Sequence, residues 1–243
     1  MRVFVAGGSG ALGRRLVPQL VARGHQVTAT ATGPAKLSLL AQLGADGVVM
    51  DGLDAVSVGE AVAAARPDAI VHQMTALSAA HAGKPDLKHP DRFFAITIRL
   101  RSEGTDHLLA AAEAIGPRPQ GGRAPLPPWA RSVGGGTGYL SWVHLDDAAS
   151  ATVLALEQQA TGVFNIADDE PAPASEWLPY LAACAGAKRP VRVPKWMARL
   201  LAGELAVIMM TEGRGFGNAK AKRELGWKLR YPSWRQGFKE ELA

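Results

Sequence analysis

Three glycines near the start of the chain have the type and spacing of a phosphate-binding loop. Gly7, Gly10 and Gly13 stand three residues apart in AGGSGALGRRL, between an apolar run and a helical pattern. Glycine lets a chain turn tightly and lets backbone amides approach a pyrophosphate without an obstructing side chain. A helix directly after the loop would add its positive end. The spacing predicts a dinucleotide site, with a purely structural turn as the alternative.

The elements that must position this loop alternate between strand and helix patterns. Leu12, Leu16 and Leu20 recur four apart in the first helical pattern, which closes on Gly24. Strands are predicted at 2–7, 25–32, 46–51 and 68–74, and helices at 11–24, 34–44, 55–66 and 91–116. Short connections between such elements indicate a parallel sheet with helices on both faces. We therefore expect an α/β fold with a Rossmann-like doubly wound parallel sheet.

A segment rich in glycine and proline interrupts the alternation. Gly116–Gly138 contains seven glycines and five prolines in 23 positions, a composition typical of a linker. Beyond it, strands are predicted at 138–145 and 162–167, and helices at 146–159, 175–185, 194–206, 218–225 and 233–242. The sequence thus predicts a dinucleotide-binding half at 1–115, a linker at 116–138, and remaining strands with a small, mainly helical substrate lobe at 139–243.

The order of the motifs resembles the short-chain dehydrogenase/reductase superfamily, specifically its extended branch of NAD(P)-dependent epimerases and dehydratases. Besides the glycine spacing, five segments are similar to that branch: IVHQMTA (70–76), EGTDHLLAAA (103–112), WVHLDDAA (142–149), GVFNIADDEP (162–171) and NAKAKRELGWKLRYPSWRQG (218–237). The resemblance implies that an acid after the third strand meets the adenine amino group and that the end of the fourth strand passes the cofactor ribose. The cofactor-binding residues that we predict are Gly7, Ser9, Gly10, Ala11, Leu12, Gly13, Arg14, Lys36, Asp51, Gly52, Gln73, Met74 and Thr75.

Several polar residues in these motifs also have ordinary structural interpretations. Asp51 suits a turn after the third strand, and His72 suits packing within the fourth. Asp146 and Asp147 are favoured as N-caps of the helix that follows them. His81, Asp86 and His89 share a loop but lack the spacing of metal ligands, so we predict no metal site.

The choice between NAD and NADP depends on the residues after the glycine loop. An acid about 20 residues past the loop normally reads the 2′-hydroxyl of NAD, yet residues 1–45 contain no Asp or Glu. Arg14 and Lys36 could instead face a 2′-phosphate. Against this, the segment TATATG at the end of the second strand is neutral. We favour NADP, with NAD as the alternative.

The chain lacks the residue pair that the resemblance implies for catalysis. Relatives of this kind use Tyr-x-x-x-Lys, in which the lysine lowers the pKa of the tyrosine that transfers a proton. The three tyrosines here are followed four residues later by Val143, Cys184 and Arg235. We therefore assign no catalytic residue, and we interpret the linker as standing where the catalytic block would be.

Three explanations of this gap remain open. The printed sequence lacks a segment of the natural chain, the gene encodes a shortened inactive relative, or a partner completes the site. The first two are favoured, because losing central strands would leave the fourth strand at an exposed edge. The segment at 162–167 could repair that edge by pairing beside the fourth strand.

Composition narrows the function classes further. The net charge is +5 and the pI about 9.6, but no nucleic-acid-binding module is recognisable, so no nucleic-acid partner is expected. The most apolar segment, Leu200–Met210, is too short to cross a bilayer, and no signal peptide is expected after Met1. A single cysteine fits the cytoplasm. The predicted function is an NAD(P)-binding oxidoreductase or epimerase relative that is catalytically impaired and takes a small-molecule substrate. The alternative is a non-catalytic NADP-binding sensor or interaction module, and homo-oligomers are possible.

Overall fold

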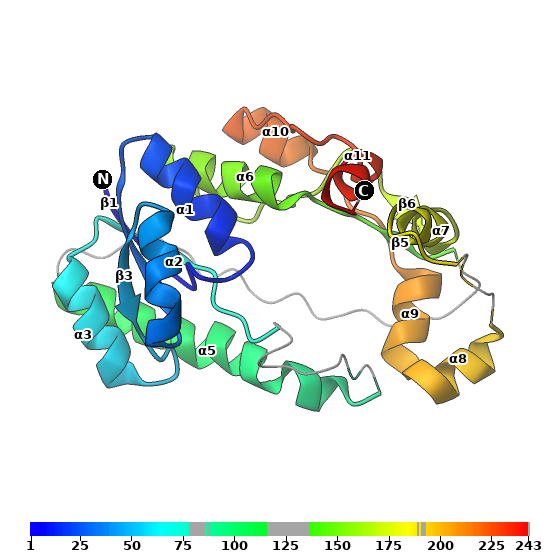
Figure 1. Cartoon of the computed structure of the whole chain (residues 1–243), viewed down its shortest axis with the longest axis horizontal. Helices are drawn as coiled ribbons and strands as arrows, with labels where there is room; N and C mark the ends of the chain where they lie inside the picture. Colours follow the sequence, from blue (N-terminus) through cyan, green and yellow to red (C-terminus); the bar gives the residue numbers. More distant parts are fainter. Residues whose placement is uncertain (78–85, 87, 116–136, 189, 191–192, 243) are drawn as a thin grey trace. The chain divides into compact units, whose positions relative to one another are not determined.

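Four short parallel strands form the sheet of the N-terminal part, in the order β3-β2-β1-β4. Figure 1 labels β1 and β3 among them. The strands are β1 (Arg2–Ala6), β2 (Gln26–Ala31), β3 (Asp46–Val49) and β4 (Ala69–His72). The structure is a computed structural model that describes residues 1–77, 86, 88–115, 137–188, 190 and 193–242. The predicted parallel sheet is confirmed. Its strand order reverses direction between β1 and β4, which is the point where open sheets of this type bind ligands.

The helices that follow these strands match the predicted patterns within a few residues. They are α1 (Gly13–Ala22), the 3₁₀ turn η1 (Pro34–Lys36), α2 (Leu37–Gln42), α3 (Ala55–Ala65) and α5 (Pro90–Ile115). Gly24 and Gly44, which follow α1 and α2, have φ angles of +79° and +86°. Only glycine adopts such angles without strain, which is why the helices end there.

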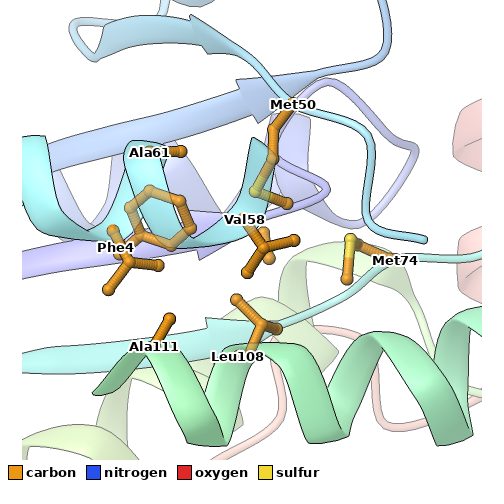
Figure 2. Close-up of a cluster of buried hydrophobic side chains, with 9 residues drawn as sticks. Phe4, Met50, Val58, Ala61, Met74, Leu108 and Ala111 are labelled. Atoms are coloured by element: carbon orange, nitrogen blue, oxygen red, sulfur yellow. The ribbon is translucent and has the colours of Figure 1, made fainter. Parts of the chain in front are cut away.

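Alternate residues of β1 face opposite sides of the sheet, and both sides are covered. Phe4 and Ala6 belong to a buried cluster with side chains of α3 and α5, and Figure 2 shows Phe4 between these two helices. Val3 and Val5, of opposite parity, are also almost fully buried. In α1, Leu16, Val17 and Leu20 are fully buried. The doubly wound α/β architecture is thus confirmed.

The C-terminal part is mainly helical, as predicted. Its strands β5 (Tyr139–Leu140) and β6 (Ala172–Pro173) form a short antiparallel pair. Its helices are α6 (Leu145–Glu157), α7 (Ala174–Cys184), α8 (Lys195–Ala202), α9 (Glu204–Glu212), α10 (Ala219–Leu225) and α11 (Trp234–Leu242). The helix predicted at 194–206 is two helices, because Gly203 between them has a φ of +88°. The strand predicted at 138–145 shortens to the two residues of β5.

The strand predicted at 162–167 is wrong. Two of its carbonyl groups are taken by side chains near α10: the Lys220 Nζ donates to the carbonyl of Val163 at 2.9 Å, and the Asn218 Nδ2 donates to the carbonyl of Ala167 at 2.8 Å. Side-chain donors of this kind replace the partner strand that a ladder needs. The segment therefore does not extend the sheet beside β4.

The described residues fall into two compact units that interleave along the chain. The first takes its described residues from Met1–Pro85, Asp91–Gly122 and Thr152–Thr161, and the second from Asp86–Pro90, Arg123–Ala151 and Gly162–Ala243. Within the first unit, Glu157 at the end of α6 pairs with Arg23 at 2.7 Å and with His25 at 3.2 Å. The domain boundaries predicted at 115 and 139 stay a prediction, and most of the predicted linker lies outside the described residues.

The core of the second unit is aromatic. Trp177 and Trp234 are buried together with Ala172 and Ala174, and Trp142 and Phe238 pack against them. The Trp142 ring contacts those of Trp177 and Phe238 edge-to-face, with centroids 4.9 and 5.1 Å apart. None of the helices described is long and apolar enough to span a membrane.

Candidate cofactor site

The glycine loop between β1 and α1 has room for main chain only. A Cβ on Gly7, whose φ is +93°, would lie 2.9 Å from the backbone of Gln73. A Cβ on Gly13 would lie 2.6 Å from the carbonyl oxygen of Gly7. Real side chains do not tolerate these distances, so both glycines are required for the loop to close on itself and on the end of β4.

Gly10 differs from its two neighbours in the motif. Its residue is exposed, and a Cβ there would approach only the Gly7 carbonyl oxygen, at 3.1 Å. This distance is shorter than an ordinary van der Waals contact, so packing favours glycine here, though less strongly than at Gly7 or Gly13. An exposed glycine at this place also suits the close approach of a ligand, as in loops that hold a pyrophosphate.

The end of β2 supports the loop from beneath. The Gly7 amide donates to the Oγ1 of Thr30 at 2.9 Å, and the Ser9 amide donates to the carbonyl of Thr30 at 3.2 Å. A Cβ on Gly8 would lie 2.6 Å from that of Ala29. Thr30, Ala29 and Gly8 were not predicted from the sequence, in which only the small residues of TATAT hinted at a crowded strand end.

The described residues provide no acceptor for three amides at the start of α1. Leu12 is the N-cap residue, and its side chain makes no capping hydrogen bond. No acidic residue lies in the first turn. Among the described hydrogen bonds, the amides of Ala11, Leu12 and Gly13 have no acceptor, whereas the next amide, that of Arg14, donates to the Gly10 carbonyl. Free amides at a helix N-terminus attract an anion. The loop thus fits the pyrophosphate of a dinucleotide.

Two basic residues were predicted to select the 2′-phosphate. Arg14 is exposed, and its Nε donates to the Ser9 carbonyl at 3.1 Å, so its guanidinium lies against the loop. Lys36 ends η1 and is partly buried. Among the described hydrogen bonds, one joins Arg14 to the loop and none joins Lys36 to it, and the roles of both residues toward a 2′-phosphate stay predictions.

The segment after β4 lies directly beside the loop. Gln73 and Met74 are the backbone neighbours of Gly7. The side chain of Met74 is buried in the cluster with α3 and α5 (Figure 2), so only its main chain is left to meet a cofactor. Thr75 is exposed.

His72, at the end of β4, is a structural residue, as its packed interpretation predicted. Its Nδ1 accepts from the Met74 amide at 3.1 Å, which leaves its Nε2 to donate to the Leu100 carbonyl at 3.0 Å. Burial lowers its pKa below the ordinary value, so the ring is neutral at pH 7. It ties the end of β4 to α5.

The turn after β3 carries Asp51 and Gly52. One carboxylate oxygen of the exposed Asp51 accepts from the Leu53 amide at 2.9 Å, which is the turn-capping role. Gly52 is buried, and a Cβ there would lie 2.5 Å from the Sδ of Met74. Gly52 thus packs against the segment after β4, while an adenine contact by Asp51 stays a prediction.

The described tyrosines all lie in the second unit, where the hydroxyl groups of Tyr180 and Tyr231 have hydrogen-bond partners and Tyr139 is exposed. The Tyr139 amide donates to the Gly213 carbonyl at 2.7 Å, and the Tyr180 hydroxyl donates to the Arg235 carbonyl at 3.3 Å. The Tyr231 hydroxyl donates to Glu240 at 2.9 Å, a bond that raises the pKa of the phenol above its ordinary value.

The predicted N-cap role of Asp146 and Asp147 is wrong. The Nδ1 of His144 accepts from the Asp146 amide at 3.2 Å, and so the histidine caps α6. Asp147 is buried, and its carboxylate accepts from the amides of Arg230 and Tyr231. Sequence alone places a carboxylate at a helix start but does not reveal a buried partner 83 residues away.

Metal chemistry has no described candidate. Asp86 and His89 pair with each other, with 2.9 Å between Oδ2 and Nδ1, and His81 lies outside the described residues. The part of the chain that the structure describes holds no group of three residues able to ligate a metal ion.

Comparison with known proteins agrees with this geometry. Residues 7–118 match a family model described as NAD(P)H-binding. A curated relative, the 3-diazoavenalumate denitrifying reductase of a Streptomyces species, is 35% identical over 314 positions that cover 99% of this chain and all of the relative. At least 71 of these 314 positions hold no residue of this chain, because the chain has only 243 residues.

Solved structures share the fold. UDP-glucose 4-epimerase of Thermus thermophilus, in complex with NAD, superposes with a TM-score of 0.69 at 18% identity, covering 98% of this chain and 97% of the other. The human epimerase family protein SDR39U1 (isoform 2), with NADPH, gives 0.53 at 22% identity, covering 99% and 98%. The 35% identical relative shows that the chain belongs to the same family as this reductase, with an NAD(P)H-binding match at residues 7–118, and the solved structures show that it shares the fold of the epimerases.

Proposed function

We propose that this protein binds NADP(H) at the glycine loop and carries out little or no catalysis with it. The observation that supports binding is the uncapped start of α1, where Ala11, Leu12 and Gly13 offer free amides beside Gly10. When bound, the nicotinamide would supply or accept a hydride. The residues of this chain would hold the pyrophosphate through the loop amides and the ribose through the main chain at 73–75.

The preference for NADP over NAD rests on charge. Arg14 is exposed at the loop and supplies a cation, while the nearest acid in the sequence after the loop is Asp46. A guanidinium suits a phosphate because it is planar and always charged. NADPH in the human relative and NAD in the bacterial one show that this fold accepts both dinucleotides.

Two observations support impaired catalysis. The alignment with the reductase leaves at least 71 positions without a residue of this chain, and they lie inside the aligned span. In addition, the proton-transferring tyrosine of the resembled family needs a lowered pKa, whereas Tyr231 has a raised one. The second candidate function, a cofactor-binding sensor or interaction module without catalysis, follows if the natural chain has this same gap.

A small molecule is the proposed substrate class, since the named relatives are a reductase and an epimerase. Its identity is a separate question from cofactor binding. We also propose a cytoplasmic location, which a single cysteine supports.

The experiment is a calorimetric titration of the purified chain with NADPH, repeated on Gly10→Val. A branched side chain at Gly10 would occupy the approach of the phosphate. Because a Cβ there would also lie 3.1 Å from the Gly7 carbonyl oxygen, the melting temperature of the variant is measured beside its affinity. We expect affinity for NADPH to be abolished in this variant. Gly59→Val is the matched control, because a Cβ at Gly59 in α3 meets no atom within 4 Å. Unchanged affinity in a folded Gly10→Val variant would make the loop a purely structural turn.

A further inference from the structure

Thr30 is the buried polar residue beneath the glycine loop. It is the penultimate residue of β2 and is 3% exposed, with Ala29 and Ala31 on either side. Its Oγ1 accepts from the amide of Gly7, and its carbonyl accepts from the amide of Ser9. The side chain and the main chain of one residue thus hold two amides of the loop.

The need for this hydroxyl follows from the shape of the turn. At Gly7 the chain leaves β1 with a φ of +93°. A partly buried amide without an acceptor costs stability, and a neighbouring alanine could not supply one. Thr30 supplies the acceptor from the adjacent strand. It therefore keeps the first turn of the loop closed against β2.

The same bonds determine which amides are used by the protein and which are left over. Gly7 and Ser9 donate to Thr30, and Gly10 donates to the carbonyl of Gly7 at 3.0 Å. The amides at 11–13, which begin α1, are left for an anion. Without its two hydrogen bonds to Thr30, the loop would adopt several arrangements. The amides at 11–13 would then no longer be held in one position.

We propose that Thr30 is a positioning residue for the cofactor pyrophosphate. It acts through Gly7 and Ser9 and holds the loop in the one arrangement that leaves the amides of α1 free. The inference rests on the proposed cofactor site. It gives the end of β2 a role in binding the pyrophosphate, which NAD and NADP share, rather than in binding the 2′-group that distinguishes them.

The test compares three variants by calorimetry with NADPH and with NADH. Thr30→Val keeps the shape of the side chain and removes the acceptor, Thr30→Ser keeps the hydroxyl, and Thr28→Val is a control two residues earlier on the same strand. We expect Thr30→Val to weaken both cofactors about tenfold and equally. Thr30→Ser should bind within about twofold of the original protein, and Thr28→Val should bind unchanged.

Two results would overturn the proposal. In the first, Thr30→Val binds both cofactors as the original protein does while its melting temperature falls, which would show that Thr30 has a structural role alone. In the second, Thr30→Ser binds as weakly as Thr30→Val. Failure of the site itself is a different result, namely unchanged NADPH affinity in Gly10→Val. If Thr30→Val does not fold, amide exchange in the unaltered protein decides. The Gly7 amide should be protected without cofactor, and those of Ala11 and Leu12 only with NADPH. Rapid exchange at Gly7 would contradict the proposal.

Discussion

The buried carboxylate of Asp147 accepts a hydrogen bond from the backbone amide of Tyr231 at 2.8 Å. Its second oxygen accepts from the amide of Arg230 at 2.7 Å, and the carbonyl of Asp147 accepts from the Nε1 of Trp227 at 3.2 Å. One residue in the first turn of α6 thus holds the chain that follows α10. This connection lies wholly within the second unit.

Asp147→Ala should therefore destabilise the second unit strongly. Two amides would lose their acceptors in a buried place, which predicts a loss of about 2–4 kcal/mol in the free energy of unfolding. Asp147→Asn, which keeps one acceptor oxygen, should lose less. Urea unfolding followed by tryptophan fluorescence measures this, because Trp142, Trp177 and Trp227 lie in that unit. Equal stability of Asp147→Ala and the original protein would contradict the role.

A second carboxylate in this unit predicts an unusual pH dependence. Asp168 is 2% exposed, and burial raises its pKa to about 6. The folded protein therefore binds this proton more tightly than the unfolded chain, whose Asp pKa is about 3.9. Stability contributed by this group is complete below about pH 4, falls as the pH rises to about 6, and stays low above that value.

Asp168→Asn should remove this loss of stability at higher pH, because the side-chain amide of asparagine is never charged. The variant is expected to gain about 1–3 kcal/mol in unfolding free energy at pH 8. At pH 4 the gain should vanish. Asn keeps an oxygen for the Glu170 amide, which donates to Asp168 at 3.1 Å. Urea unfolding at both pH values is the measurement, and a difference that does not change with pH would contradict the assignment.

The first unit was predictable because local patterns and tertiary packing agree there. Leu16 and Leu20, four apart in the sequence, are both fully buried on α1. Gly24 and Gly44 end their helices with positive φ angles, as their positions indicated. The parallel sheet follows from alternating strands and helices joined by short connections. The glycine loop was predictable for the same reason, since its shape depends on main chain and glycine.

The second unit was harder because long-range side chains decide its local structure. The apolar residues at 162–167 are typical of a strand, yet Lys220 and Asn218 occupy two of its carbonyl groups. Asp147 looks like a helix cap until Tyr231 is placed beside it. The contact of Thr30 with the glycine loop was not predicted for a similar reason, because no pattern within β2 reveals that Gly7 lies beside it. These contacts join residues that are 23 to 84 positions apart.

The preference for NADP predicts a selective effect of charge. Replacing Arg14 and Lys36 together with glutamine should weaken NADPH about tenfold to a hundredfold and leave NADH nearly unchanged, because only the 2′-phosphate loses its partners. The two single variants show how much each residue contributes to NADPH affinity. Arg14→Gln should lose more affinity than Lys36→Gln, since Arg14 has a hydrogen bond to the loop. Arg101→Gln on α5 is a control for net charge. Equal weakening of NADH and NADPH would reject the assignment.

The 243-residue chain should show little or no dehydrogenase turnover even when it binds NADPH. Reduction of a carbonyl needs a proton on the developing alkoxide, and a positioned acid contributes about 10²–10⁴-fold to such a step. No Tyr-x-x-x-Lys is present, and Gly116–Gly138 contains no Tyr, Lys, His, Asp or Glu. Its arginines stay protonated near neutral pH and are poor acids. His144, a possible substitute, is occupied as the cap of α6 and by Glu241 at 3.1 Å.

The assay follows NADPH absorbance with a panel of aldehydes, ketones and nucleotide sugars, alongside a calorimetric check that the cofactor is bound. Turnover at ordinary enzyme rates would show that another group delivers the proton. Tyr139→Phe and His144→Gln would then be the first variants to examine, since Tyr139 is exposed and His144 carries a titratable ring. The intact mass of the natural protein completes the test. If it exceeds that of 243 residues by a block containing the missing pair, activity should return with the block, because the acid and the platform that orients the nicotinamide return together.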